Sequence, residues 1–179
     1  MILSKSSLFC SKLNAANTLS VPEDRFGSTT HISVIDKDGN ASSATTTNGE
    51  GCGSILPQAG FMMNNMLGEE DLNPDGFFLH PKGLRLPTMM APTIVLKDGK
   101  PILVTGSAGS NRIRSVVIQM IANTLCNGMD IVKATELPRI HLEGNTLHAE
   151  PGVPEDELDK LSKHFKIKKW HDKNVFFGG

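Results

Sequence analysis

The sequence predicts an α+β fold. Three pairs of alternating or β-branched segments are each joined by a short turn that contains glycine, which is the pattern of antiparallel hairpins. One other segment carries apolar residues at the helical spacing, and another begins with the proline and acidic residues typical of a helix start. Hairpins followed by a helix, and then by more strands, describe α+β organisation. The length of 179 residues suits one domain with a sizeable core.

The first hairpin is expected from residues 31 to 36 and 40 to 47. Its turn contains Asp38-Gly39, a strong hairpin signal. The glycine-rich loop 48–54 follows, and it lacks the Gly-Lys-Ser/Thr ending of a phosphate loop.

A short strand is predicted at residues 61–65. Residues 67–86 form a long acidic connection that contains proline and glycine. Long irregular segments inside a compact domain often have a function. The second hairpin is expected from residues 93–96 and 101–105.

The most clearly periodic helix is expected at residues 111–126, and the following Asn127-Gly128 pair ends it. Its periodic apolar positions are Ile113, Val116, Val117, Met120, Ile121 and Leu125. A short helical turn over residues 131–135 ends before Pro138.

The last part of the chain predicts a third hairpin from residues 139–142 and 146–149. A helix over residues 154–165 begins with proline and acidic residues, which suit the positive end of a helix. A strand is expected at 166–171, and the pair Phe176-Phe177 is also strand-like.

Bulk properties exclude several classes of function. A net charge of −1 and a pI near 6.6 give no electrostatic case for binding nucleic acid or an anionic membrane. The three cysteines are far apart and suggest neither a disulfide framework nor a metal site. The six histidines lack metal-ligand spacing, so no metal or cofactor is implied. No apolar run approaches the length of a transmembrane span.

Thr29 is the candidate nucleophile. Cleavage of the peptide bond between Ser28 and Thr29 would leave a hydroxyl and a free α-amine on one residue. That amine, with an ordinary pKa of about 7.7–8.0, could act as general base for its own hydroxyl. Threonines at the start of a strand are also common for their β-propensity, so the residue types alone leave both interpretations open.

Motifs in order along the chain resemble the γ-glutamyltransferase (γ-glutamyltranspeptidase) family. The resemblance begins with the run from Thr29 to Ala41 and continues through three further segments, 60–65, 90–95 and 104–109. Members are N-terminal-nucleophile hydrolases that cleave themselves before a threonine. The resemblance implies one half of an αββα sandwich, in which two stacked antiparallel sheets lie between helical layers.

The resemblance also implies a domain organisation. Residues 1–28 correspond to the end of a large subunit and the linker to the cleavage site, and residues 29–179 to the small-subunit catalytic domain. Both ends of the chain look cut, so the expected partner is the large subunit from the same precursor. The resemblance is compatible with a periplasmic or extracellular enzyme, although the residues themselves assign no compartment.

The resemblance carries catalytic roles onto specific residues. Thr47 matches the threonine that hydrogen-bonds the nucleophile and assists processing. Gly109 and Ser110 match two successive glycines whose backbone N–H groups form the oxyanion hole, and a serine keeps the required N–H. The substrate-contacting asparagine of the family falls on Gly49, with Asn48 one place earlier.

Recognition of the γ-glutamyl group is carried over less completely. The family's two acidic residues that hold the substrate α-amino group fall on Met66 and Glu69. Two serines that bind the α-carboxylate fall on Thr88 and Met89, of which only Thr88 can donate from its side chain. An arginine that pairs with this carboxylate belongs to the large subunit.

The leading hypothesis is an enzyme that transfers a γ-glutamyl group from glutathione or a similar donor to water or an amine, through an acyl-Thr29 intermediate. The Met66 and Met89 replacements motivate an alternative, a related acylase that takes another acyl group such as glutaryl. A third hypothesis is an unprocessed chain that serves only as an assembly partner and is inactive alone.

Overall fold

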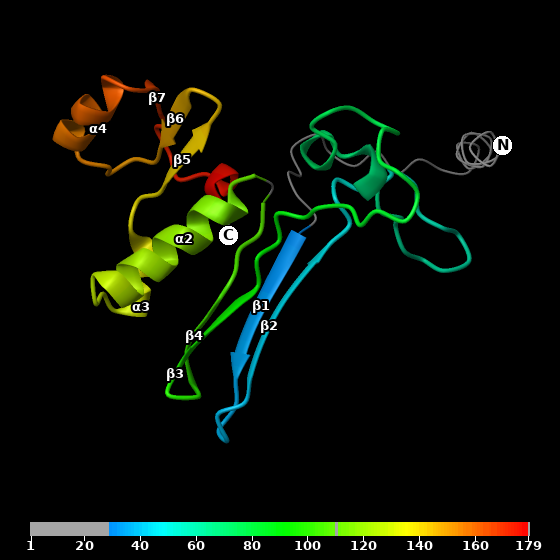
Figure 1. Ribbon diagram of the computed structural model, residues 1–179, viewed down its shortest axis with the longest axis horizontal. Helices are drawn as coiled ribbons and strands as arrows, with labels where there is room; N and C mark the ends of the chain where they lie inside the picture. The colour runs from blue at the N-terminus through cyan, green and yellow to red at the C-terminus, as the bar shows by residue number, and fades with distance from the viewer. Residues whose placement is uncertain (1–28, 110, 179) are drawn as a thin grey trace. The chain divides into compact units, whose positions relative to one another are not determined.

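The computed structural model describes residues 29–109 and 111–178. Among these, Thr47–Leu84 belong to one compact unit, and Thr29–Thr46 together with the chain from Arg85 onward belong to a second (Figure 1). Each unit is described by itself. The mixture of hairpins and helices confirms the predicted α+β class.

The first hairpin joins β1 (Thr29–Ile35) to β2 (Ala41–Thr47). Asp36 builds the turn because its Oδ1 accepts hydrogen bonds from the backbone N–H groups of Asp38 and Asn40, both at 2.9 Å. Hydrogen bonds to its carboxylate lower the pKa of Asp36 below its ordinary value, and the bond donated by the Asn40 side chain contributes most. Gly39 adopts a φ of +84°, as the Asp-Gly signal predicted.

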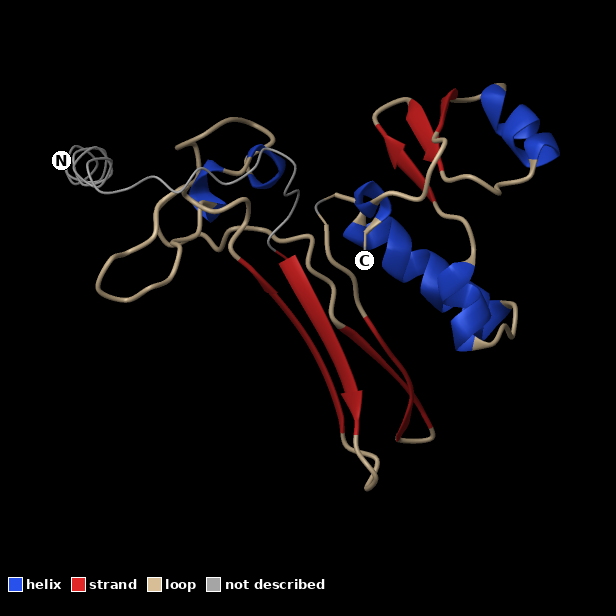
Figure 2. Ribbon diagram, turned by 180° about the vertical axis from the view of Figure 1, so that it is seen from behind, coloured by secondary structure: helices blue, strands red, loops and turns tan. Residues whose placement is uncertain are grey.

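The second hairpin joins β3 (Thr93–Lys97) to β4 (Lys100–Thr105) in antiparallel register, with an irregularity between Val95 and Leu96. It contacts the first hairpin directly, since Ser43 Oγ donates to the carbonyl of Thr105 at 3.1 Å. Figure 2 shows both hairpins as long red strands. The side chains of β2 alternate between half-buried and exposed, as expected for a hairpin with one covered face.

Helix α2 (Ile113–Ile121) continues into a π-helical turn, η3 (Ala122–Cys126), so the two together match the predicted helix closely. The short α3 (Ile131–Glu136) is capped by Asp130, whose side chain accepts from the N–H groups of Val132 and Lys133. Val116 and Met120 of α2 pack with Ala134 of α3 in a buried cluster.

The last sheet contains β5 (Ile140–Glu143), β6 (Thr146–Ala149) and β7 (Lys166–Lys169) in that order. β5 and β6 form the predicted antiparallel hairpin. β7 returns parallel to β6 after α4 (Glu155–Ser162), whose Leu158 is buried. A single turn of 3-10 helix, η4 (Val175–Phe177), follows.

Two predicted strands are wrong. Residues 61–65 form no strand, because their pairing with the preceding loop is limited to an isolated bridge between Ile55 and Met62 and single bonds such as Cys52 N–H to Met63 O at 2.9 Å. The Phe176-Phe177 pair is helical instead of extended. Asn174 accounts for this by accepting from Phe176 N–H with its side chain and from Phe177 N–H with its carbonyl.

The long connection predicted at residues 67–86 is irregular, as expected, apart from the 3-10 turns η1 (Met66–Gly68) and η2 (Glu70–Leu72). Within the described ranges, no helix combines the length and apolar character needed to cross a bilayer.

Candidate active site

Thr29 is the first residue of β1 and is half-buried. Ser28, the other side of the predicted cleavage site, lies outside the described residues. Because strand side chains alternate, His31 lies on the same face of β1 as Thr29. The strand therefore presents the candidate nucleophile and an imidazole side by side on one surface.

His31 connects β1 to neighbouring segments. Its Nδ1 is hydrogen-bonded to Thr45 Oγ1 and its Nε2 to Ser33 Oγ, both at 2.8 Å. Burial lowers the pKa of His31, which favours the neutral ring. The ring also lies against Gly106, where a Cβ atom added to the glycine would overlap the imidazole. Only glycine fits this position without displacing His31.

Gly106 opens the turn that leads from β4 to α2 and carries Gly109. Ser107 is 1% exposed, and its hydroxyl donates to the carbonyl of Ala108 at 3.1 Å. Gly109 has a φ of +114°, a conformation that L side chains rarely adopt. Ser110, the second predicted oxyanion-hole residue, lies outside the described residues. β1 and the turn with Gly109 thus belong to the same unit, and His31 of β1 contacts Gly106 at the start of that turn.

Thr47 ends β2 and opens the glycine-rich loop, with its Oγ1 accepting from Gly49 N–H at 3.0 Å. Asn48 contributes its backbone carbonyl, which accepts from Gly51 N–H at 3.0 Å and from Asn65 N–H at 3.2 Å. These bonds fold the loop onto the segment around Asn65.

Glu69 and Asn65 hold the same loop through their side chains. Glu50 N–H donates to Glu69 Oε1 at 2.7 Å and to Asn65 Oδ1 at 2.8 Å. Asn65 Oδ1 also accepts from Gly51 N–H at 3.2 Å. The structure therefore brings the predicted substrate residues Asn48 and Glu69 into one hydrogen-bonded network, which includes an asparagine that the sequence did not assign to the site.

This network explains why glycine stands at position 49. A Cβ on Gly49 would overlap Asn65 Oδ1 and Glu69 Oε1, and its φ of +66° also disfavours any side chain. The asparagine expected here by resemblance has no room while both oxygens occupy the space.

Thr88, the third predicted substrate residue, is exposed in the loop before β3, where its Oγ1 accepts from Met90 N–H at 3.2 Å. It belongs to the second unit, whereas Asn48 and Glu69 belong to the first. Within the first unit, the structure groups Asn48 with Glu69.

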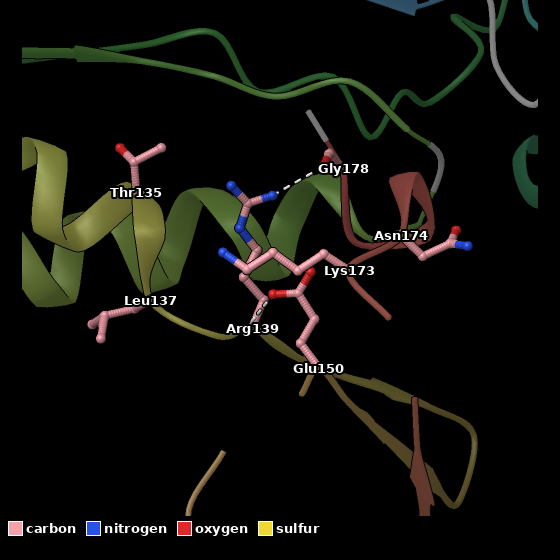
Figure 3. Close-up of a pocket in the computed structure, with 7 residues that line it drawn as sticks. All are labelled: Thr135, Leu137, Arg139, Glu150, Lys173, Asn174 and Gly178. Carbon is pink, nitrogen blue, oxygen red and sulfur yellow. Dashed lines mark hydrogen bonds between the residues drawn. The ribbon is translucent and has the colours of Figure 1, made fainter. Parts of the chain in front are cut away.

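A cavity of about 340 Å³ lies in the second unit and was not predicted from the sequence. Figure 3 shows the side chains of Arg139, Glu150 and Lys173 around it. Arg139 Nη1 donates to the carbonyls of Phe177 at 3.2 Å and Gly178 at 2.9 Å, so the guanidinium holds the end of η4. In the described part of the chain, no three His, Cys, Asp or Glu residues are grouped so as to hold a metal ion.

Comparison with known proteins identifies relatives for nearly the whole chain. Residues 4–179 match the family model described as gamma-glutamyltranspeptidase. The chain is 37% identical over 148 residues to the glutathione hydrolase proenzyme of Escherichia coli, covering 74% of this chain and 25% of the relative. It is 36% identical over 129 residues to an acylase proenzyme, ACY 1, of a Pseudomonas strain, covering 71% of this chain and 23% of the relative.

A solved structure shares the fold. The T380A mutant of the Helicobacter pylori gamma-glutamyltranspeptidase superposes with a TM-score of 0.70 and 35% sequence identity, covering 79% of this chain and 84% of that chain. The likeness confirms the predicted N-terminal-nucleophile hydrolase fold. The chain spans about a quarter of the length of the curated relatives that it matches.

Proposed function

The chain belongs to the gamma-glutamyltranspeptidase family, and from this premise we propose that it supplies the nucleophile and part of the oxyanion hole of a γ-glutamyltransferase or glutathione hydrolase. The observation that carries the proposal is the packing of His31 against Gly106. It places the strand that begins with Thr29 beside the turn that carries Gly109.

The first proposed step is self-cleavage. The Thr29 hydroxyl attacks the carbonyl carbon of Ser28, the Ser28–Thr29 peptide bond is replaced by an ester, and water hydrolyses that ester. The products are a new carboxylate on residue 28 and a free α-amine on Thr29. Before this step the nitrogen is an amide and cannot serve as a base, so cleavage creates the catalytic group.

In turnover, the free amine accepts the proton of Thr29 Oγ as the oxygen attacks the γ-carbonyl carbon of the donor. The N–H of Gly109 stabilises the negative charge that develops on the carbonyl oxygen, a contribution worth about 3 kcal/mol of barrier for each donor. The amine of the leaving group takes up the proton and departs, leaving an acyl ester on Thr29. Water or an acceptor amine then attacks the ester and regenerates the hydroxyl.

Substrate recognition is proposed for the loop network of the first unit. Glu69 is half-exposed, and its carboxylate accepts one backbone N–H while retaining capacity for a cationic group. This suits the α-ammonium of a γ-glutamyl donor such as glutathione. Asn48 and Thr88 are proposed to add hydrogen bonds, Thr88 toward the α-carboxylate.

The remainder of the precursor is the proposed partner. From the resemblance of the run that begins at Thr29, we assign residues 1–28 to the end of a large subunit and residues 29–179 to the catalytic small subunit. The chain spans about a quarter of its relatives' length, which is compatible with a longer precursor. The two subunits together would form the complete sandwich and supply the arginine for the substrate carboxylate.

Mutation of Thr29 in the complete precursor tests the proposal. Thr29→Ala should abolish both self-cleavage and turnover of a γ-glutamyl anilide, since no hydroxyl remains to attack. Thr29→Ser should retain both to a measurable degree. Gel analysis of the subunits and a rate assay report the two steps separately.

The control is Thr30→Ala, which removes the neighbouring exposed hydroxyl and should leave processing intact. If Thr29→Ala still yields two separate subunits and normal turnover, Thr29 is not the nucleophile.

A related acylase is the second candidate, favoured by the similarity to a Pseudomonas acylase and by Met66 and Met89 at positions where polar groups are expected. A higher kcat/KM for a glutaryl anilide than for the γ-glutamyl anilide would select it. Mass spectrometry for a species that begins at Thr29 separates either enzyme from an unprocessed assembly partner.

A further inference from the structure

The end of η4 lies against the turn that carries Gly109. A Cβ built on Gly178 would approach Ala108 O to 2.8 Å and Val116 Cγ2 to 3.3 Å, so the Gly178 backbone packs directly on this turn and on α2. From the other side, a Cβ built on Gly109 would meet Gly178 Cα at 3.7 Å. The two glycine backbones therefore face each other at close range.

Arg139 fixes the position of this contact. Its Nη1 donates to the carbonyls of both Phe177 and Gly178, and Figure 3 shows the guanidinium reaching across to Gly178. The backbone N–H of Arg139 donates to Glu150 Oε2 at 2.8 Å. Arginine stays charged at all working pH values, and bonds from a charged donor are among the stronger ones in proteins.

The residues next to Arg139 are tied to α2. Gln119 Oε1 accepts from Ile140 N–H at 3.1 Å, and Gln119 Nε2 donates to the carbonyls of Ile140 at 2.9 Å and Ser115 at 2.7 Å. Two hydrogen bonds between Gln119 and Ile140 therefore join the residue next to Arg139 to the helix that follows the turn.

Aromatic packing secures the same segment. Phe177 is 1% exposed. The Phe176 ring stacks on Trp170 and on His148, each with ring centroids 4.7 Å apart. The guanidinium of Arg112, the residue just before α2, lies 4.4 Å from the centre of the Phe176 ring. The segment thus contacts Ala108 and Arg112, which lie on either side of Gly109 in the chain.

We propose that Gly178 and Arg139 are positioning residues for the oxyanion turn. The Phe177–Gly178 backbone, held by Arg139, packs against this turn and fixes the direction of the Gly109 N–H. The inference rests on the proposed function. A preorganised donor is effective only when its direction is fixed before charge develops, so a displaced support lowers the rate of chemistry and leaves substrate binding intact.

The test compares Gly178→Ala with Gly39→Ala in the complete, processed enzyme. Both glycines have similar φ values, +88° and +84°, so alanine is strained at both, but nothing lies within 4 Å of a Cβ at Gly39. Gly178→Ala should lower kcat about ten- to a hundredfold and leave KM within about twofold. Gly39→Ala should leave both unchanged.

Ligand affinity separates positioning from general damage. A γ-boronic acid analogue of glutamate, which forms a tetrahedral adduct with the nucleophile, should bind Gly178→Ala more weakly by about the factor lost in kcat. Glutamate itself should bind both variants as it binds the wild type. Equal weakening of both ligands, or an unchanged kcat in the processed variant, overturns the proposal.

Arg139 variants provide a second route if Gly178→Ala fails to fold. Arg139→Gln loses the charged donor, whereas Arg139→Lys retains one, so kcat should fall in the order wild type, Lys, Gln. Hydrogen exchange of the Gly109 amide should be faster in Arg139→Gln than in wild type, and this readout requires no turnover.

Wild-type turnover distinguishes the two proposals. If the wild-type enzyme hydrolyses neither the γ-glutamyl nor the glutaryl anilide, the proposed function fails. The exchange rate of the Gly109 amide then still decides the positioning role, and an unchanged rate in Arg139→Gln rejects it.

Discussion

At the scale of single residues, Gly106 and His31 depend on each other. The imidazole fills the space that a side chain at residue 106 would need. Its two nitrogens are held by Thr45 and Ser33, so the ring cannot turn away without losing hydrogen bonds. Because the backbone at Gly106 does not have a positive φ, steric overlap is the reason that glycine is required there.

Gly106→Ala should therefore destabilise the enzyme by about 1–3 kcal/mol through overpacking. In a His31→Ala background the added methyl group has room, so the same substitution should cost much less. A double-mutant cycle on urea unfolding midpoints measures this coupling.

Additive effects of the two substitutions would show that the ring and the methyl group do not compete. The matched control is Gly99→Ala at the tip of the second hairpin, where nothing lies within 4 Å of a Cβ. Any loss there reflects its φ of +75° alone, without a collision.

At the scale of elements, the β5–β6 hairpin contains two buried histidines. His141 and His148 are paired across the strands and are 4% and 7% exposed. His141 Nδ1 is hydrogen-bonded to Ser115 Oγ at 2.8 Å, and its Nε2 is buried with no partner. Trp170 Nε1–H donates to His148 Nδ1 at 3.2 Å, so that nitrogen must be unprotonated.

Burial is the main cause that lowers the pKa of both histidines. Arg112 lowers both further, Lys168 acts on His148 and Arg114 on His141, whereas Glu143 opposes the shift of each. The unfolded chain therefore binds more protons than the folded chain once the pH falls below the ordinary value of 6.5. The stabilisation is fully present above this value and is lost as the pH decreases through the folded pKa values.

The thermal unfolding midpoint should consequently decrease as the pH is lowered from 7.5 to 5. His148→Gln should flatten this decrease, because a glutamine oxygen can accept from Trp170 and gains no proton. Calorimetry of the enzyme at several pH values provides the measurement.

The matched control is His164→Gln, which replaces an exposed histidine and should leave the slope unchanged. An identical pH slope in His148→Gln and wild type would exclude His148 as the group responsible.

At the scale of the whole molecule, large apolar side chains remain uncovered on both long hairpins. Ile32 on β1 and Leu96 on β3 are each 59% exposed, and Ile35 and Ile102 are close to half exposed. Exposed apolar side chains gathered on two neighbouring hairpins are typical of an interaction surface, and we propose one here. The chain spans about a quarter of its relatives, so the proposed occupant of this surface is the rest of the precursor.

Residues 29–179 produced alone should therefore bind a hydrophobic dye, aggregate and show no γ-glutamyl turnover. Production together with the rest of the proposed precursor should suppress dye binding and restore activity. Fluorescence titration and size-exclusion chromatography follow the two properties.

A matched variant, Ile32→Thr with Leu96→Thr in the isolated chain, should reduce dye binding without restoring turnover. A soluble, monomeric and active isolated chain would contradict the proposed need for a partner.

The amino-acid sequence alone determined the hairpins and α2, because each depends on short-range chemistry. Asp36 and Gly39 close their turn with bonds between near neighbours, and the apolar period of α2 is visible in the chain itself. The family motifs around Thr29 and Gly109 are likewise local runs of residues.

Only the tertiary structure decided the contacts between distant segments. The parallel pairing of β7 with β6, the loop network of Asn65 and Glu69, and the contact of Gly178 with the turn that carries Gly109 all join residues far apart in sequence. Residues 61–65 and 176–177 have strand-like composition, yet bonds to the loop and to Asn174 give them other conformations. Side-chain type limits what each residue can do, but the folded backbone decides which partner it meets.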